Sequence, residues 1–337
     1  MKTLALVESP AQLLNVLEWS HQTGADLDQQ TTVVLAPANR VSRTQLRRTA
    51  ELGTATGHRI RWVEPRQDAV AAVRSVASLA TELRGVDRLV VGDPFSGVIQ
   101  VLLSVLGPRE VVMVDDGTAT IEFARLWAAG EDLVRWHSSP LGGPRRRIAA
   151  LVRRRIGTGS GCRISLFTAM PVEPGGLPQL RNDFSWVRSL CPPPRVKDTS
   201  DLIGTSLVET GVVDRAHYLQ GVSTLARTHS VDRYFAHRLE RDDKLAEIAR
   251  LGLRVVRPDL PLELVARREP IGQTLISFPS TVVHTLPLVL QDTASRLLVC
   301  GIADDWYTQQ APQSSDRFLG QVATSARDAH GLLSVAC

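Results

Sequence analysis

Short apolar runs alternate with longer stretches of helical pattern from the third residue onward. Strands are predicted where β-branched and other apolar residues run together, at residues 3–7, 31–36, 59–63, 87–92 and 110–114. Helices are predicted between these runs, at residues 10–23, 40–55, 66–84 and 95–106. Alternation of this kind favours an α/β fold, in which parallel βαβ units are joined by right-handed crossovers.

A second alternation begins near residue 201. It predicts strands at residues 202–207, 231–236, 253–257, 273–278 and 296–301, and helices at 214–228, 240–251, 261–267, 281–290 and 314–333. Glycines, prolines and arginines interrupt the pattern between the two alternations. We therefore expect an N-terminal Rossmann-like domain at 1–160, an irregular linker at 161–200, and a C-terminal Rossmann-like domain with a terminal helix at 201–337. The default ligand site of such a pair is the cleft between the domains.

The composition is that of a soluble globular protein, with 43% hydrophobic and 22% charged residues. No apolar run approaches the roughly 18 residues that a membrane span needs. The apolar start of the chain meets Glu8 at once, so it predicts a buried strand instead of a signal peptide. The four cysteines show no paired spacing, which predicts neither a zinc site nor a disulfide framework and fits a reducing cytoplasm.

Ser9-Pro10-Ala11-Gln12 follows the first predicted strand. Ser9 suits the N-cap of the next helix, Pro10 its first position, and Gln12 completes a capping box. Capping alone explains this motif. A second interpretation is that Ser9, Gln12 and Asn15 also face the ligand cleft, because the strand-to-helix turn opens there.

Asp115-Asp116-Gly117 ends the fifth predicted strand. Adjacent carboxylates repel each other, which raises the pKa of one of them and suits a general base. Gly117 permits the sharp turn that would expose them. An ordinary acidic turn is the plain alternative. A magnesium-binding pair would need a second acidic cluster, which the sequence lacks, so no metal site is predicted.

His237-Arg238 and Ser280-Thr281 each follow a predicted strand of the second half. An imidazole and a guanidinium together could neutralise a phosphate, and the histidine could donate a proton to it. Ser280 or Thr281 would cap the next helix, whose free N–H groups and dipole favour an anion. Glu263, after a proline, could accept hydrogen bonds from a ribose diol. Taken singly, each of these residues also fits a structural role.

The segment Arg145–Arg155 carries two arginine triplets around the apolar run 148–152. As a helix, it would be a basic element with an apolar stripe, able to contact anionic lipid or a polyanionic acceptor. A solvated helix or linker is the alternative. Aromatic residues are not interleaved with these arginines and no nucleic-acid-binding motif is present, so we expect no nucleic-acid partner.

The order and spacing of these motifs resemble those of bacterial sialyltransferases and α-2,8-polysialyltransferases. These families carry an acidic-acidic-glycine motif, a His-Pro motif and a Ser-Ser/Thr motif. The similarity runs from Ser9 to Thr281 and is densest over 204–281. The chain departs from the pattern where Arg238 follows His237, because the family motif has a proline there.

The resemblance implies a GT-B fold, in which two Rossmann-like domains face a central cleft. It implies a bacterial enzyme of polysaccharide biosynthesis that moves sialic acid or a related nonulosonate from a CMP donor to a hydroxyl of a glycan or small-molecule acceptor. Transfer would be inverting and metal-independent, with no cofactor. Independently of the resemblance, the cysteines and the basic segment lead us to expect a cytoplasmic protein, with Arg145–Arg155 contacting the inner membrane face or a polyanion. The alternatives are a GT-B glycosyltransferase with another nucleotide sugar, and a non-catalytic GT-B relative in surface-polysaccharide assembly.

The resemblance also implies residue roles. One aspartate of the acidic pair would be the base; we favour Asp115 and leave Asp116 open. His237 would assist departure of CMP by contacting its phosphate, Ser280 and Thr281 would hold that phosphate, and the role of Glu209 stays open. The positions expected to bind substrate or donor are Ser9, Gln12, Gly117, Glu209, Arg238, Glu263, Ser280 and Thr281.

Overall fold

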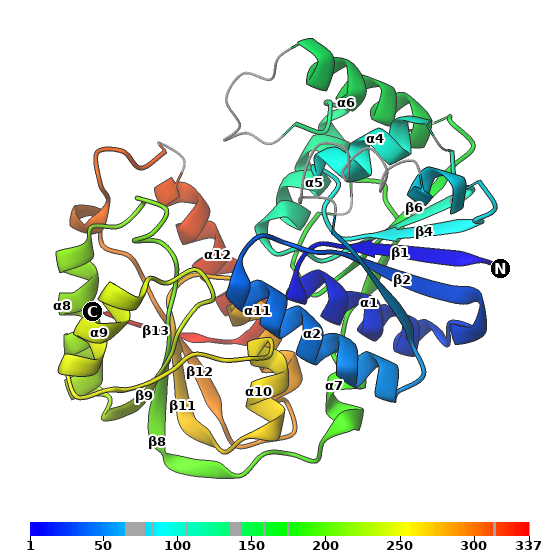
Figure 1. Cartoon of the computed structure of the whole chain (residues 1–337). Helices are drawn as coiled ribbons and strands as arrows, with labels where there is room; N and C mark the ends of the chain where they lie inside the picture. The colour runs from blue at the N-terminus through cyan, green and yellow to red at the C-terminus, as the bar shows by residue number, and fades with distance from the viewer. Residues whose placement is uncertain are drawn as a thin grey trace. The chain divides into compact units, whose positions relative to one another are not determined.

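The chain forms two compact units, Met1–Trp186 and Val187–Cys337, each built around a parallel sheet (Figure 1). The computed structural model describes residues 1–64, 78–82, 84–105, 107–134, 143–157, 159–173, 175–312 and 315–336 of the 337. Because the boundary falls near residue 186, the first unit is longer than the 160 residues predicted for it.

The first sheet has the strand order β3-β2-β1-β4-β5-β6-β7, and all of its neighbouring strands run parallel. Its strands are β1 (Thr3–Val7), β2 (Gln30–Leu35), β3 (Arg59–Val63), β4 (Arg88–Val91), β5 (Glu110–Val114), β6 (Arg163–Thr168) and β7 (Gln179–Arg181). The prediction of β1 to β5 is confirmed to within about one residue. Strands buried on both faces appear in sequence as apolar runs, which applies to β1, β2, β4 and β5, whereas the edge strand β3 is only partly buried.

Helices cover both faces of this sheet. They are α1 (Pro10–Thr23), α2 (Arg40–Ala55), α4 (Gly97–Val105), α5 (Thr118–Ala129) and α6 (Gly143–Ile156), with the 3₁₀ turn η1 (Leu27–Gln29). α1 packs against α2 on one face, and α4 packs against α6 on the other (Figure 1). α1 begins as predicted, with Ser9 as N-cap and Pro10 at its start. Most of the predicted helix 66–84 lies outside the described residues.

The segment 161–200, expected to be an irregular linker, instead continues the first sheet. It contains β6 and β7, then α7 (Ser185–Leu190), which spans the boundary between the units, and the start of β8 (Val196–Ile203). The glycines near residue 159 that suggested a linker belong to the turn between α6 and β6. Glycine marks turns inside a domain as readily as between domains.

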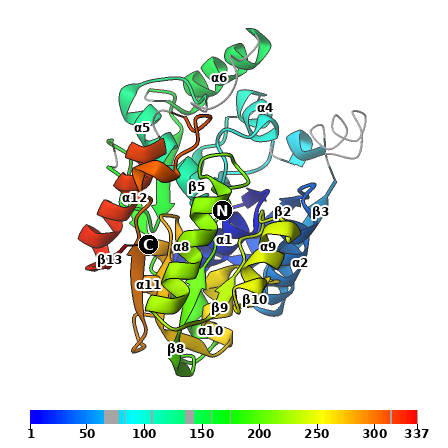
Figure 2. The ribbon, with the colours of Figure 1, turned by 90° about the vertical axis from the view of Figure 1, so that its left-hand side faces the viewer.

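The second sheet has the order β10-β9-β8-β11-β12-β13, again entirely parallel. After β8 its strands are β9 (Val231–Phe235), β10 (Arg254–Val256), β11 (Ile271–Ser277), β12 (Arg296–Cys300) and β13 (Leu333–Val335). Its helices are α8 (Arg215–Thr228), α9 (Asp242–Arg250), α10 (Leu262–Arg268), α11 (Val282–Val289) and α12 (Ser315–His330), with the turn η2 (Asp304–Trp306). α8 and α9 cover one face, and α10 to α12 cover the other (Figures 1 and 2).

The structure also describes the lengths of the helices and the state of three cysteines. Among the described residues, no helix combines the length and the apolar character needed to cross a bilayer. Cys162 and Cys191 are free thiols, whereas Cys300 is disulfide-bonded. The spacing of the cysteines did not predict that disulfide.

Candidate active site

In the first unit, Asp115 is fixed inside the protein at the carboxyl end of β5. It is 3% exposed, and its carboxylate accepts hydrogen bonds from Thr168 Oγ1 and, at 2.6 Å, from the Ala169 N–H. Burial raises the pKa of Asp115 to about 6, while these hydrogen bonds act in the opposite direction. Both carboxylate oxygens therefore hold the loop that follows β6.

Asp116 differs from its neighbour because it is only half-buried. Its Oδ1 accepts a 3.2 Å hydrogen bond from Ser9 Oγ, and its backbone N–H donates to Thr120 Oγ1 at 3.0 Å. Gly117 then turns the chain with φ 64° and ψ −124°, a conformation that disfavours residues with a Cβ, and α5 begins. Of the two acids, Asp116 has the more exposed side chain.

Ser9 and Gln12 lie where the strand order of the first sheet reverses, between β1 and β4. Gln12 is 2% exposed, and its Oε1 accepts a 2.7 Å hydrogen bond from the Glu8 N–H. A Cβ on Gly92, at the end of β4, would lie 2.2 Å from Gln12 Cγ. The side chain of Gln12 therefore fits against β4 only because residue 92 is a glycine. Gln12 thus stabilises the turn between β1 and α1, whereas Ser9 contacts Asp116.

Two asparagines support the acidic loop, and sequence reasoning missed one of them, Asn182. Asn15 Nδ2 donates to the backbone oxygen of Asp115 at 3.1 Å, and Asn182 Nδ2 donates to Asn15 Oδ1 at 2.7 Å. Asn182 belongs to the loop after β7, in the segment expected to be a linker. No local pattern could have signalled this pairing, because Asn15 and Asn182 are 167 positions apart.

In the second unit, His237 lies two residues after the end of β9. Its Nδ1 accepts a 3.3 Å hydrogen bond from the Leu239 N–H, so the ring proton of the neutral imidazole resides on Nε2. Burial, together with the positive charges of Arg238 and Lys244, lowers the pKa of His237 to about 3. At neutral pH the ring is therefore an uncharged hydrogen-bond donor.

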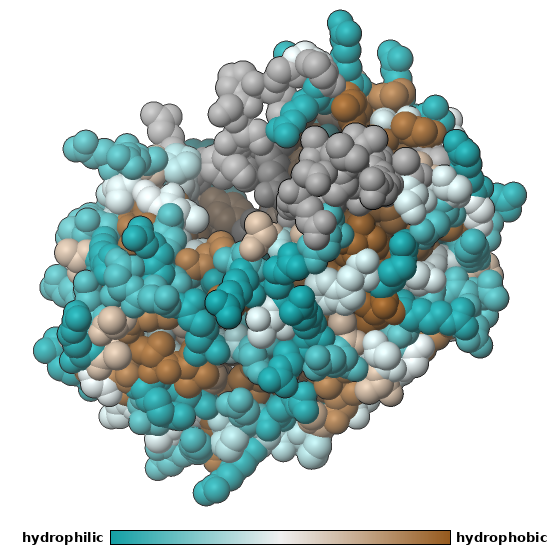
Figure 3. Space-filling model, viewed as in Figure 1, coloured by the Kyte–Doolittle hydropathy of each residue, from teal (hydrophilic) through white to brown (hydrophobic). Residues whose placement is uncertain are grey.

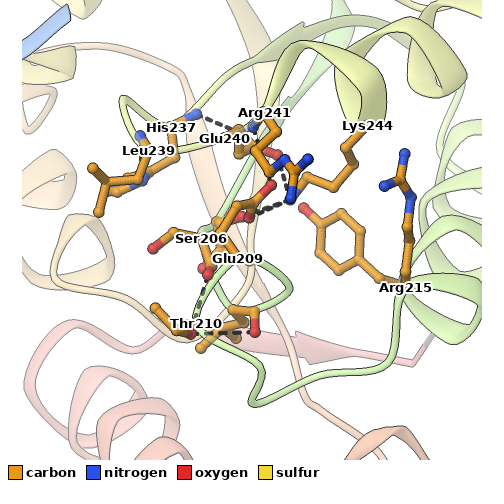
Figure 4. Close-up of polar contacts among 12 residues, drawn as sticks. Ser206, Glu209, Thr210, Arg215, His237, Leu239, Glu240, Arg241 and Lys244 are labelled. Atoms are coloured by element: carbon orange, nitrogen blue, oxygen red, sulfur yellow. Dashed lines mark hydrogen bonds and ion pairs between the residues drawn. The ribbon is translucent and has the colours of Figure 1, made fainter. Parts of the chain in front are cut away.

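A buried lysine holds the loop of His237 in place (Figure 4). Lys244 is 1% exposed; its Nζ lies 2.8 Å from Glu240 Oε1 and 2.9 Å from Glu209 Oε2, and donates to the Thr205 carbonyl at 3.0 Å. The other oxygen of Glu240 accepts a 2.5 Å hydrogen bond from the His237 N–H. Lys244 therefore joins the loop after β8 to the loop after β9.

Two tyrosines complete this cluster. Tyr234 Oη donates to Glu240 Oε1 at 2.6 Å and lies 2.7 Å from Tyr218 Oη. Burial raises the pKa of both phenols well above the ordinary value, so they remain protonated donors. A Cβ on Gly204 would lie 2.4 Å from Tyr234 Oη, which explains a glycine at the end of β8. The i, i+4 spacing of Glu240 and Lys244 was the one sequence signal for this cluster.

Ser280 and Thr281 connect β11 to α11. Thr281 occupies the N-cap position, but its side chain makes no capping hydrogen bond, and Ser280 Oγ lies 3.4 Å from Ser277 Oγ. Both residues are half-buried beside the positive end of the α11 dipole. Glu263 Oε1 instead accepts a 2.7 Å hydrogen bond from Thr285 Oγ1, which ties α10 to α11.

The predicted residues therefore gather at the carboxyl edge of their own sheets. In the first unit Ser9 touches Asp116 directly. In the second, the loops with Glu209, His237, Arg238, Ser280 and Thr281 follow the neighbouring parallel strands β8, β9 and β11. Open α/β sheets bind ligands at this edge, where the strand order reverses. Within the described parts of the chain, no group of three or more His, Cys, Asp or Glu side chains is placed to hold a metal ion.

No protein-family model matches the sequence, and neither does any curated protein. Solved structures do match over nearly the whole chain. An α/β-galactoside α-2,3-sialyltransferase from Photobacterium phosphoreum is 9% identical with a TM-score of 0.53, and the match covers 99% of this chain and 98% of that one.

Two further similar structures have lower TM-scores. The GT-B domain of a Photobacterium damselae sialyltransferase is 11% identical with a TM-score of 0.49 and full coverage of both chains. The E. coli heptosyltransferase WaaC with ADP is 12% identical with a TM-score of 0.43, covering 97% of this chain and 99% of that one. Two parallel Rossmann-like sheets and the match along the whole sialyltransferase chain give this protein the two-domain GT-B fold.

Proposed function

We propose that the protein is a glycosyltransferase that moves sialic acid or a related nonulosonate from a CMP donor to a hydroxyl group of a glycan or small-molecule acceptor. The observation that carries the proposal is that the neutral His237 and the hydroxyls of Ser280 and Thr281, all suited to contact a phosphate, follow strands at one edge of the second sheet. The likeness in fold to a sialyltransferase supports it. Transfer inverts the anomeric centre and uses no metal ion.

The base in this scheme is Asp116. Its half-buried carboxylate accepts the proton of the acceptor hydroxyl, while Ser9 orients it through the 3.2 Å hydrogen bond. The acceptor oxygen forms a bond to the anomeric carbon of the donor sugar, and the bond from that carbon to the phosphate oxygen of CMP breaks. The electron pair leaves with CMP. Asp115, whose oxygens are both engaged, positions the loop.

The groups of the second unit stabilise the departing CMP. His237 donates a hydrogen bond from Nε2 to the phosphate, the hydroxyls of Ser280 and Thr281 donate others, and the N-terminus of α11 adds a favourable dipole. Arg238 adds a positive charge next to the phosphate. Because CMP is already a good leaving group, positioning and charge neutralisation are the main requirements.

Nucleotide binding tests this function most directly. We expect CMP, in the absence of metal, to raise the melting temperature of the protein more than ADP, CDP, UDP, GDP or dTDP. Binding at about 100 times the dissociation constant adds roughly 2.7 kcal/mol to the free energy of unfolding, a readily measured shift. The double variant Ser280→Ala/Thr281→Ala should lose most of the CMP effect, whereas Thr210→Ala, a loop residue bonded only to nearby carbonyls, should keep it.

A donor with another nucleotide is the second candidate. It is favoured by Arg238, which stands where the sialyltransferase motif has a proline. The same panel separates the candidates, because preferential stabilisation by ADP, UDP, GDP or dTDP contradicts the CMP donor while leaving a glycosyltransferase. No stabilisation by any nucleotide would favour a non-catalytic relative.

The low pKa of His237 makes the stability of the protein depend on pH. Between pH 6.5 and about 3 the unfolded chain binds a proton that the folded ring excludes. The free energy of unfolding should therefore fall as pH drops through this window, by up to about 1.4 kcal/mol per pH unit. Urea unfolding at several pH values should show a shallower decline for His237→Gln than for the wild type. His229→Gln, at the end of α8, is the control, and equal slopes for all three proteins would contradict the assignment.

A further inference from the structure

The basic helix α6 buries one of its faces completely. Ala149, Val152 and Ile156 are 0% exposed, and α6 packs against α4. Arg153 lies over the ring of Trp127, with its Cζ 4.4 Å from the ring centroid. The apolar stripe of α6 is therefore packed inside the first unit, and it is not available to insert into a membrane.

The opposite face of α6 combines arginines with an exposed aliphatic side chain. Arg147, Leu151 and Arg154 follow one another at i, i+4 and i+7, which places them along one line of the helix surface, and Arg155 follows Leu151 by four. All four residues are exposed, Leu151 by 40%. In Figure 3, hydrophilic groups project beside hydrophobic ones at the top of the view, where Figure 1 places α6.

A second exposed aliphatic residue lies next to this face. Val105, at the end of α4, is 60% exposed. Arg155 Nη1 lies 3.9 Å from the position that a Cβ on Gly107 would take, so Arg155 adjoins the residues that follow α4. Two exposed aliphatic side chains thus belong to the same part of the surface as the arginines of α6. We call Arg147, Leu151, Arg154, Arg155 and Val105 the basic face.

We propose that the basic face docks the protein on an anionic lipid bilayer. Guanidinium groups pair with lipid phosphates, and Leu151 and Val105 enter the interface between headgroups and acyl chains. A polyanionic glycan would also attract the arginines, but it offers hydrated hydroxyls in place of hydrocarbon, so it would gain nothing from exposed leucine and valine. Because the stripe of α6 is buried in the protein, the contact is superficial, reversible and weakened by salt.

Vesicle co-sedimentation of the full chain tests this docking, with phosphatidylcholine vesicles that contain or lack phosphatidylglycerol. The wild type should bind only the anionic vesicles, and binding should weaken as salt is raised. Removal of three arginines from the basic face should lower the partition coefficient about 100-fold. That variant is Arg147→Gln/Arg154→Gln/Arg155→Gln. A control with the same change in charge, on exposed arginines of the second unit, should remain close to the wild type; it is Arg227→Gln/Arg250→Gln/Arg317→Gln.

A second variant distinguishes binding of the basic face to a lipid bilayer from binding to a polyanion. Val105→Gln/Leu151→Gln keeps every charge, so it should weaken binding to the anionic vesicles and leave retention on immobilised heparin unchanged. Equal vesicle binding by the two arginine variants would overturn the proposal, and so would absence of wild-type binding. Unaltered vesicle binding by the aliphatic variant would make the basic face a polyanion site instead. None of these outcomes depends on the identity of the sugar donor.

Discussion

Replacing Asp116 by asparagine should lower the turnover number about 10²–10⁴-fold, the usual contribution of a general base. Asparagine has nearly the same shape and can still accept the hydrogen bond from Ser9, so the loop should keep its conformation. The variant lacks the capacity to take a proton from the acceptor hydroxyl. Transfer to an acceptor, measured with the donor that the nucleotide panel selects, checks this, and the melting temperature should stay close to that of the wild type.

Asp115→Asn is the matched comparison, because it makes the same chemical change one residue earlier. Its two carboxylate oxygens accept from the Ala169 N–H and from Thr168 Oγ1, whereas an amide has only one oxygen, so the Thr168 hydroxyl would have to turn from donor to acceptor. We therefore expect Asp115→Asn to lower the melting temperature. The assignment of the base would be wrong if Asp116→Asn kept normal turnover while Asp115→Asn lost it without loss of stability.

Replacing Lys244 by methionine should destabilise the second unit by about 3–5 kcal/mol, as expected when one partner of a buried ion pair is removed. Methionine fills a similar volume but leaves Glu209 and Glu240 without the ammonium group that lies 2.9 and 2.8 Å from them. The backbone of His237, bonded to Glu240, should lose its support as well. Urea denaturation measures the first effect, and a weakened nucleotide-induced thermal shift measures the second.

Controls for this prediction come from the same chain. Lys2→Met removes an exposed lysine and should change stability little. Adding Glu240→Gln to Lys244→Met removes one of the unpaired carboxylates, so the double variant should recover part of the lost stability. A Lys244→Met protein as stable as the wild type would show that the buried carboxylates do not need the ammonium group.

The sheet was predictable from the sequence where burial is complete. β1 and β5 are apolar at nearly every position, which is the signature of strands covered on both faces, and polar motifs follow their carboxyl ends. β6 was missed although most of its residues are buried, because the glycines before it suggested a linker. Thus local pattern located the elements, but it did not show which turns lie inside a domain.

The sequence allowed us to predict which loops form the site, but it did not allow us to predict which side chains in those loops contact one another. Asp115-Asp116 and His237 were identified from their places at strand ends, and the structure keeps them there. Which aspartate is open to a substrate depends on Thr168 and Ala169, more than 50 positions away. Likewise, Lys244 looked like an ordinary helix residue, because its burial against Glu209 arises only when β8 and β9 are neighbours.

The support of the acidic loop also has a consequence for the order in which the site can form. Asp115 and Asn15 are held by Thr168 and Asn182, so the loop gains its full set of partners only after β6 and β7 have joined the sheet. During synthesis from the N-terminus, the first 160 residues can pair β1 to β5 while the acidic loop remains mobile. A fragment cut at the domain boundary that the sequence suggested would therefore retain Asp116 with Ser9 and Thr120. It would lack the residues after position 160 that hold the neighbouring Asp115 and Asn15.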